Sequence, residues 1–133
     1  MIMTARILIA DDNPHMRHAL RNLLEHNPEW QVCGEAVDGR DAVSKARQLS
    51  PDLVVMDFLM PGLNGLEAAR EINKSVPNAR VLMCTMYVSR QLTEAAKNAG
   101  IQGAVSKSGV NELTKGVEAV LRDETYFDLP KAS

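Results

Sequence analysis

The sequence has little of what marks secreted, membrane-spanning or disulfide-stabilised chains. Only two of its 133 residues are cysteines. Cys33 and Cys84 stand apart among apolar residues, without the spacing of a zinc site or a disulfide framework, so we expect two reduced, buried thiols. The N-terminus lacks the apolar core of a signal peptide, and no run approaches the roughly 20 apolar residues that span a bilayer. These absences predict a cytoplasmic protein that does not contact a membrane.

The sequence also has no excess of positive charge. Its 15 Lys and Arg residues face 17 Asp and Glu residues, which leaves a net charge of -2 at pH 7. Such a balance does not attract the phosphate backbone, so we expect that this domain itself binds no nucleic acid. The length fits one domain, which we place at residues 1–122. Residues 123–133, with several charges and Pro130, are expected to form a tail or the start of a linker.

Short apolar runs predict the strands of a parallel sheet. Four runs lie at residues 6–10, 53–56, 81–84 and 104–106. The first three are continuous rather than alternating, which is typical of strands buried on both faces of a sheet. A weaker, alternating run at residues 31–36 predicts a half-exposed edge strand.

Apolar residues at helical spacing fill the segments between these runs. Met16, Leu20, Leu23 and Leu24 form one such stripe, and similar stripes lie at residues 42–49, 66–76, 92–99 and 113–121. Strands and helices therefore alternate five times. Short connections of this kind require right-handed crossovers, so we predict an α/β fold: a single, doubly wound domain with five parallel strands and five helices.

Polar residues follow the predicted strands at the point where each strand ends. They are Asp11 and Asp12, Asp57, Thr85, and Lys107. In an open α/β sheet ligands bind beyond the carboxyl ends of the strands, so we expect these five side chains to converge. Three crowded carboxylates repel one another unless a cation lies between them. Mg2+ suits such a site because it prefers oxygen ligands and keeps coordination positions for phosphate oxygens.

Phosphoryl transfer is the chemistry that this set of residues favours. A carboxylate beside a divalent ion can attack phosphorus as a nucleophile, and Asp57 is the candidate because it stands alone at a central strand end. A simpler interpretation makes the acidic pair a helix cap beside Pro14, and Asp57 the start of a turn. A cap needs one carboxylate, however, and the pair offers two.

Taken together, these residues resemble the receiver domain of two-component response regulators. The resemblance rests on four motifs in order: IADDN at 9–13, VMDFLMPGLNG at 55–65, CT at 84–85 and VSK at 105–107. It covers about residues 5–122 and implies a flavodoxin-like sheet of strand order 2-1-3-4-5. Ser108, and a second resemblance at residues 119–129, point to the subfamily with a C-terminal helix-turn-helix output domain that controls transcription.

The resemblance also implies a role for each site residue. Asp57 would accept phosphate from a sensor histidine kinase or a phosphotransfer protein. Asp12, Asp57 and the backbone carbonyl of Leu59 would bind Mg2+, or Mn2+ in its place, while Asp11 would bind through water. Lys107 would contact the phosphoryl group, and Thr85 would move toward it as a switch. Phosphorylation would then alter partner contacts, including those of a homodimer.

Departures from the family pattern keep two other hypotheses open. Ala104 stands where the family usually has an aromatic residue, and Met86 where the residue is normally small, so slow phosphorylation or an altered relay is expected. A vestigial site in a pure interaction module is one alternative. The other is a Mg2+-dependent phosphohydrolase, although such an enzyme would be expected to have an acid at Leu59. Two further residues are expected to border the site: Met60 and Tyr87.

Overall fold

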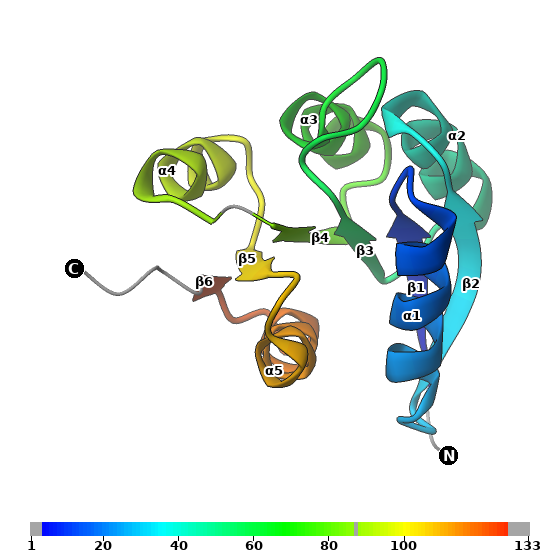
Figure 1. Ribbon diagram of the computed structural model, residues 1–133. Helices are drawn as coiled ribbons and strands as arrows, with labels where there is room; N and C mark the ends of the chain where they lie inside the picture. The colour runs from blue at the N-terminus through cyan, green and yellow to red at the C-terminus, as the bar shows by residue number, and fades with distance from the viewer. Residues whose placement is uncertain (1–3, 87, 128–133) are drawn as a thin grey trace.

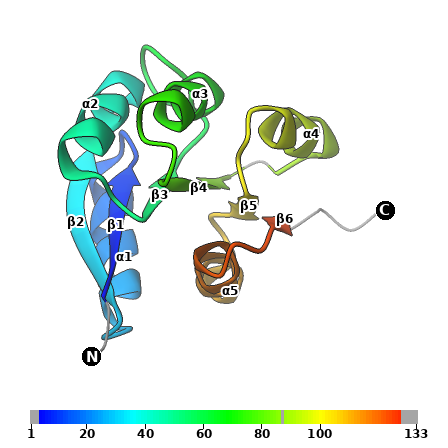
Figure 2. The same cartoon turned by 180° about the vertical axis from the view of Figure 1, so that it is seen from behind.

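The computed structural model describes residues 4–86 and 88–127. They form a six-stranded sheet in the order β2-β1-β3-β4-β5-β6, and every neighbouring pair of strands is parallel. Helices cover both faces (Figures 1 and 2). The predicted α/β class and the order of the first five strands are therefore confirmed.

The elements alternate along the chain as expected. The strands are β1 (Ala5–Ala10), β2 (Trp30–Ala36), β3 (Leu53–Met56), β4 (Arg80–Thr85), β5 (Gly103–Ser106) and β6 (Tyr126–Phe127). The helices are α1 (Pro14–Glu25), α2 (Gly39–Leu49), α3 (Gly65–Ser75), α4 (Arg90–Asn98) and α5 (Val110–Leu121). In the described residues, no helix has the length and apolar character that crossing a membrane requires.

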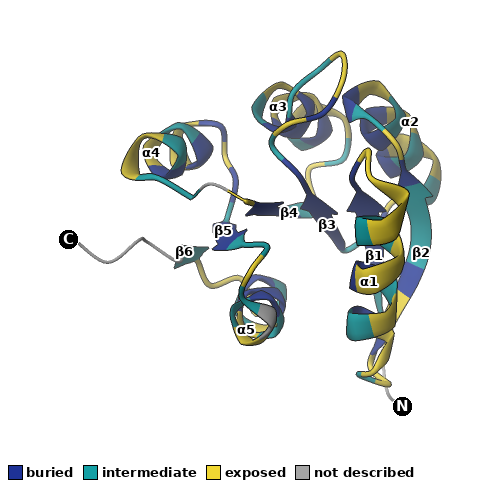
Figure 3. Cartoon of the chain, viewed as in Figure 1, coloured by how far each residue is buried: buried dark blue, intermediate teal, exposed yellow. Residues whose placement is uncertain are grey.

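The core consists of two apolar layers separated by the sheet. One lies under α1 and α5 and includes Ile7, Ile9, Leu24 and Val117. The other lies under α2, α3 and α4. The central strands are buried along both faces, and the outer faces of the helices are exposed (Figure 3). This arrangement explains why the apolar runs at residues 53–56 and 81–84 do not alternate.

The edge strand β2 pairs with β1 in two register segments. Ile7 lies opposite Val32 and Leu8 lies opposite Gly34, so Cys33 is the extra residue of a bulge. Its burial pattern includes exposed and intermediate positions, as predicted for an edge strand. Cys33 is half-buried and Cys84 is buried; both are free thiols, and burial raises the pKa of Cys84 to about 12.

The sheet differs from the prediction at its other edge. Tyr126 and Phe127 add the sixth strand beyond β5, within the segment expected to be a tail or linker. A strand of two residues is too short to produce a periodic pattern, and its conformation depends on pairing with β5. Residues 128–133 lie outside the described residues, so the domain boundary at residue 122 stays a prediction.

Candidate functional site

Backbone hydrogen bonds between neighbouring strands position the acidic residues. The N–H of Asp57 donates to the carbonyl of Ala10 at 3.0 Å, and the N–H of Asp11 donates to the carbonyl of Ala36 at 3.1 Å. These bonds continue the ladder one residue beyond the strands. They fix the chain ends of β1 and β3 next to each other at the carboxyl edge of the sheet.

The three predicted acidic residues gather at that edge. Asp11, Asp12 and Asp57 each present one carboxylate oxygen within 4.8 Å of the others. Asp11 and Asp57 are buried, while Asp12 is exposed. A pair of buried carboxylates with a third at the solvent side is open to an ion from one direction. This arrangement confirms that the strand ends bring the three carboxylates together.

Lys107 bridges the two buried carboxylates. Its Nζ lies 2.7 Å from Oδ2 of Asp11 and 2.9 Å from Oδ2 of Asp57. Burial alone would lower the pKa of Lys107, but the hydrogen bonds to Asp11 and Asp57 outweigh it, and the pKa is raised. The ammonium therefore stays charged and offsets part of the repulsion between the carboxylates.

One carboxylate oxygen at the site has no protein partner within the described residues. Oδ1 of Asp57 is buried and accepts no hydrogen bond. Leaving such an oxygen without a partner costs free energy, so it is suited to a cation or an ordered water. With the solvent-facing carboxylate of Asp12 nearby, the donor set fits a hard divalent ion that keeps some of its waters.

The simpler interpretation of the acidic pair is not supported. The cap of α1 is Asn13, whose side-chain oxygen accepts from the N–H groups of His15 and Met16. Asp11 instead uses Oδ1 to accept from the N–H of Asn13 at 2.9 Å. Neither aspartate is needed as the helix cap.

The loop after Asp57 depends on two glycines. Gly62 has a φ of 76°, which favours glycine. Gly65 begins α3 against the strand end, where an added Cβ would lie 2.5 Å from the carbonyl oxygen of Asp57. The helix therefore approaches the Asp57 backbone as closely as it does only because residue 65 has no side chain.

The comparisons with known proteins agree with this geometry. The sequence model of the response regulator receiver domain family matches residues 7–118. The chain belongs to this family. It is a receiver domain, the signalling module of two-component response regulators.

Relatives of this receiver domain include both sequences and solved structures. The response regulator protein VraR of Staphylococcus aureus is 32% identical over 127 residues, which cover 95% of this chain and 61% of VraR. A LuxR-family response regulator from Aurantimonas sp. SI85-9A1 is 39% identical, with a TM-score of 0.89 and coverage of 92% of this chain and 89% of that one. The response regulator domain of Thermotoga maritima CheB is 30% identical, with a TM-score of 0.81 and coverage of 90% and 95%. The chain thus spans about three fifths of the length of VraR.

The remaining predicted residues of this receiver domain lie in different surroundings. Thr85 is buried at the end of β4 and lines an apolar hollow of about 400 Å3 beside Leu59. Ala104 is fully buried in β5, and Met60 packs within the layer under α2, α3 and α4. Met86 is 57% exposed. Tyr87 lies outside the described residues.

Sequence reasoning missed one residue that supports the receiver site. Arg17 of α1 donates from Nη1 to the carbonyl of Asp11 at 2.8 Å and from Nε to Glu35 of β2 at 3.1 Å. It had appeared to belong to a solvated helix face. Its partners lie on two other elements, so no local pattern in the sequence could have revealed them.

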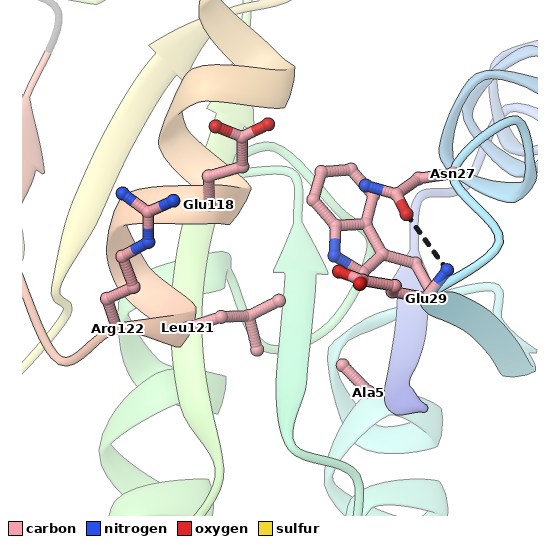
Figure 4. A pocket seen from close by; sticks show the side chains of 7 residues that line it. Ala5, Asn27, Glu29, Glu118, Leu121 and Arg122 are labelled. Carbon is pink, nitrogen blue, oxygen red and sulfur yellow. Dashed lines mark hydrogen bonds between the residues drawn. The ribbon is translucent and has the colours of Figure 1, made fainter. Parts of the chain in front are cut away.

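A second hollow lies far from the carboxylates, at the amino end of β1. It holds about 300 Å3 between the start of the sheet and the end of α5 (Figure 4). Its lining residues are Ala5, Asn27, Glu29, Trp30, Glu118, Leu121 and Arg122. Parallel sheets bind ligands at the opposite edge, so this hollow is not part of the receiver site.

Proposed function

We propose that this receiver domain accepts a phosphoryl group on Asp57 in a magnesium-dependent reaction. The observation that carries the proposal is the pairing of a buried, partnerless oxygen on Asp57 with two further carboxylates and a bridging lysine. The reaction is self-catalysed phosphorylation and dephosphorylation of a signalling protein, rather than turnover of a separate substrate.

The transfer needs a nucleophile, a cation and a fixed positive charge. A carboxylate oxygen of Asp57 attacks the phosphorus of a phosphohistidine on a sensor kinase or phosphotransfer protein. The P–O bond forms as the P–N bond breaks, and the leaving imidazole nitrogen keeps the electron pair and takes a proton. Mg2+, when bound, neutralises the charge on the phosphoryl oxygens.

Each residue of the site has a part in the proposal. Asp12, Asp57 and the carbonyl of Leu59 would hold Mg2+ or Mn2+, with Asp11 acting through water. Lys107 would move from its bridge toward the phosphoryl oxygens, and the Thr85 hydroxyl would hydrogen-bond to them. These assignments follow the family motif residue by residue, and the observed convergence of the five residues at one edge supports them.

The output of the switch belongs to the same proposal. VraR is longer than this chain, and the relative from Aurantimonas is described as a LuxR-family response regulator. We therefore place this domain, in the cytoplasm, ahead of a transcription-controlling output domain. Phosphorylation would change its partner contacts, including those of a homodimer.

Incubation with acetyl phosphate and Mg2+ tests the transfer directly. We expect intact-protein mass spectrometry to show one added phosphoryl group, which is lost in Asp57→Ala and without Mg2+. The matched control is Asp123→Asn, which alters an exposed aspartate outside the site and should keep the label. No label on the wild-type protein, or an unchanged label on Asp57→Ala, contradicts the proposal.

A further inference from the structure

The chain after α5 folds back onto the sheet. Asp123 turns the backbone with a φ of 64°, and its carboxylate accepts from Nε of Arg80 in β4 at 2.7 Å. Three residues later, the N–H of Tyr126 donates to the carbonyl of Gln102 at 3.0 Å. The segment that leads out of the domain is therefore attached to two strands of its sheet.

The pairing of β6 with β5 requires a close approach of the two backbones. Gly103 lies opposite Tyr126, and Ala104 lies opposite Phe127. A Cβ on Gly103 would lie 2.6 Å from the carbonyl oxygen of Tyr126. The small residues of β5 thus form a seat that is fitted to this short strand.

The two aromatic residues of β6 pack on opposite faces of the sheet. Tyr126 packs against the layer under α1 and α5, and its hydroxyl donates to the carboxylate of Glu112 in α5. Phe127 packs against the layer that contains Ala104, and Nζ of Lys97 in α4 lies 5.0 Å from the centre of its ring. A cation over an aromatic face is favourable, so β6 is held by both flanking helices.

The strand that seats β6 also carries the site lysine. Ser106 lies opposite Thr85 in the ladder, and the N–H of Lys107 donates to the carbonyl of Thr85 at 2.9 Å. Ala104 is only three residues before Lys107. A shift of Lys107 or Thr85 along the strand direction therefore changes the register in which β5 presents its edge to β6.

We infer that β6 reads the state of the site: the interaction surface formed by α4, β5 and α5 is occupied by the chain's own Tyr126–Phe127, which is released on phosphorylation. The inference rests on the proposed transfer to Asp57. A phosphoryl group there adds close to two negative charges, which draw Lys107 out of its bridge between Asp11 and Asp57. A strand of two residues has few contacts with which to resist such a displacement, so its release frees the chain beyond residue 127.

Hydrogen exchange on the whole 133-residue chain tests the release. We expect saturating beryllofluoride with Mg2+ to shift the backbone resonances of Asp57 and Lys107, and to lower the protection of the Tyr126 amide by about tenfold. Shifts at the site with unchanged or increased protection of Tyr126 overturn the inference alone. No shift at the site contradicts the proposed function, and the inference falls with it.

Binding reciprocity supplies a second measurement. If the ligand loosens β6, then a variant with a weakened β6 must bind the ligand more tightly, here by about fivefold. Phe127→Ala and the surface variant Lys97→Met should both lower the dissociation constant of beryllofluoride. The control Lys74→Met, at an exposed lysine of α3, should leave it unchanged. Unchanged or weaker binding by both β6 variants overturns the inference.

Discussion

Among single residues, Lys107 decides whether the site is stable without an ion. It supplies the positive charge that lies within 3 Å of both buried carboxylates. Without it, Asp11 and Asp57 would face each other in a site from which most water is excluded. Removing one member of a buried ion pair is costly because the remaining charges stay desolvated.

The substitution Lys107→Met should therefore destabilise the domain by about 3 kcal/mol in the absence of divalent ions. Mg2+ should recover more stability in this variant than in the wild-type protein, because it replaces the lost charge. Urea unfolding with and without Mg2+ measures both effects. Lys74→Met is the control and should change stability by less than about 0.5 kcal/mol. Equal stability of Lys107→Met and wild type without Mg2+ would show that the bridge contributes nothing.

At the scale of elements, the close approach of α3 to the Asp57 backbone can be tested with two glycines. In Gly65→Ala the new methyl group meets a backbone oxygen, so we expect a loss of about 1–3 kcal/mol and weaker labelling of Asp57. In Gly62→Ala the methyl group meets no atom within 4 Å, and only the positive φ is penalised. Gly62→Asn should recover part of that loss because asparagine tolerates this conformation, whereas Gly65→Asn should recover nothing. Urea unfolding and mass spectrometry report the two effects, and equal labelling of the two alanine variants would contradict the contact.

The connection between α1 and β2 predicts a dependence on pH. Glu35 accepts from Nε of Arg21 at 2.8 Å and from Nε of Arg17 at 3.1 Å, and these hydrogen bonds hold its pKa below the usual value. A lowered pKa in the folded state adds stability at pH values above the unfolded pKa of about 4.3, and this stability is lost as the pH falls through the folded value. Glu35→Gln should therefore cost about 0.5–1 kcal/mol at pH 7, a typical value for a partly exposed ion pair. The difference from wild type should disappear in urea titrations below about pH 4, and a difference that grows on acidification would contradict this assignment.

The elements also show which parts of the fold a sequence can predict. The buried strands β3 and β4 appear as continuous apolar runs because both of their faces are covered, and α1 appears as a regular stripe. These patterns are local. The strand β6 is not local: Tyr126 and Phe127 become a strand because Gly103 and Ala104 leave room beside them. The contact of Arg17 with Asp11 was missed for the same reason.

For the whole molecule, topology explains how much of the site could be predicted. Asp11 and Asp57 lie 46 residues apart, yet the β1–β3 pairing brings them to one edge, so knowing the fold class was enough to expect their convergence. The fold class does not specify which oxygens pair. That Lys107 bridges two carboxylates while Oδ1 of Asp57 has no partner among the described residues depends on side-chain packing.

The same topology predicts that Mg2+ stabilises the folded domain as a whole. The carboxylates converge only when β1 and β3 are paired, so the ion binds the native state in preference to the unfolded chain. Native-state binding raises the free energy of unfolding by about 2.7 kcal/mol when the ion is at 100 times its dissociation constant. Asp12→Asn should remove most of this gain with little change in stability without Mg2+, because Asp12 is exposed. Glu71→Gln, at an exposed acid of α3, should keep the gain. Thermal unfolding over a series of MgCl2 concentrations, matched in ionic strength with NaCl, separates site binding from screening. Equal midpoints in the two salts would show that the three carboxylates do not act as a metal site.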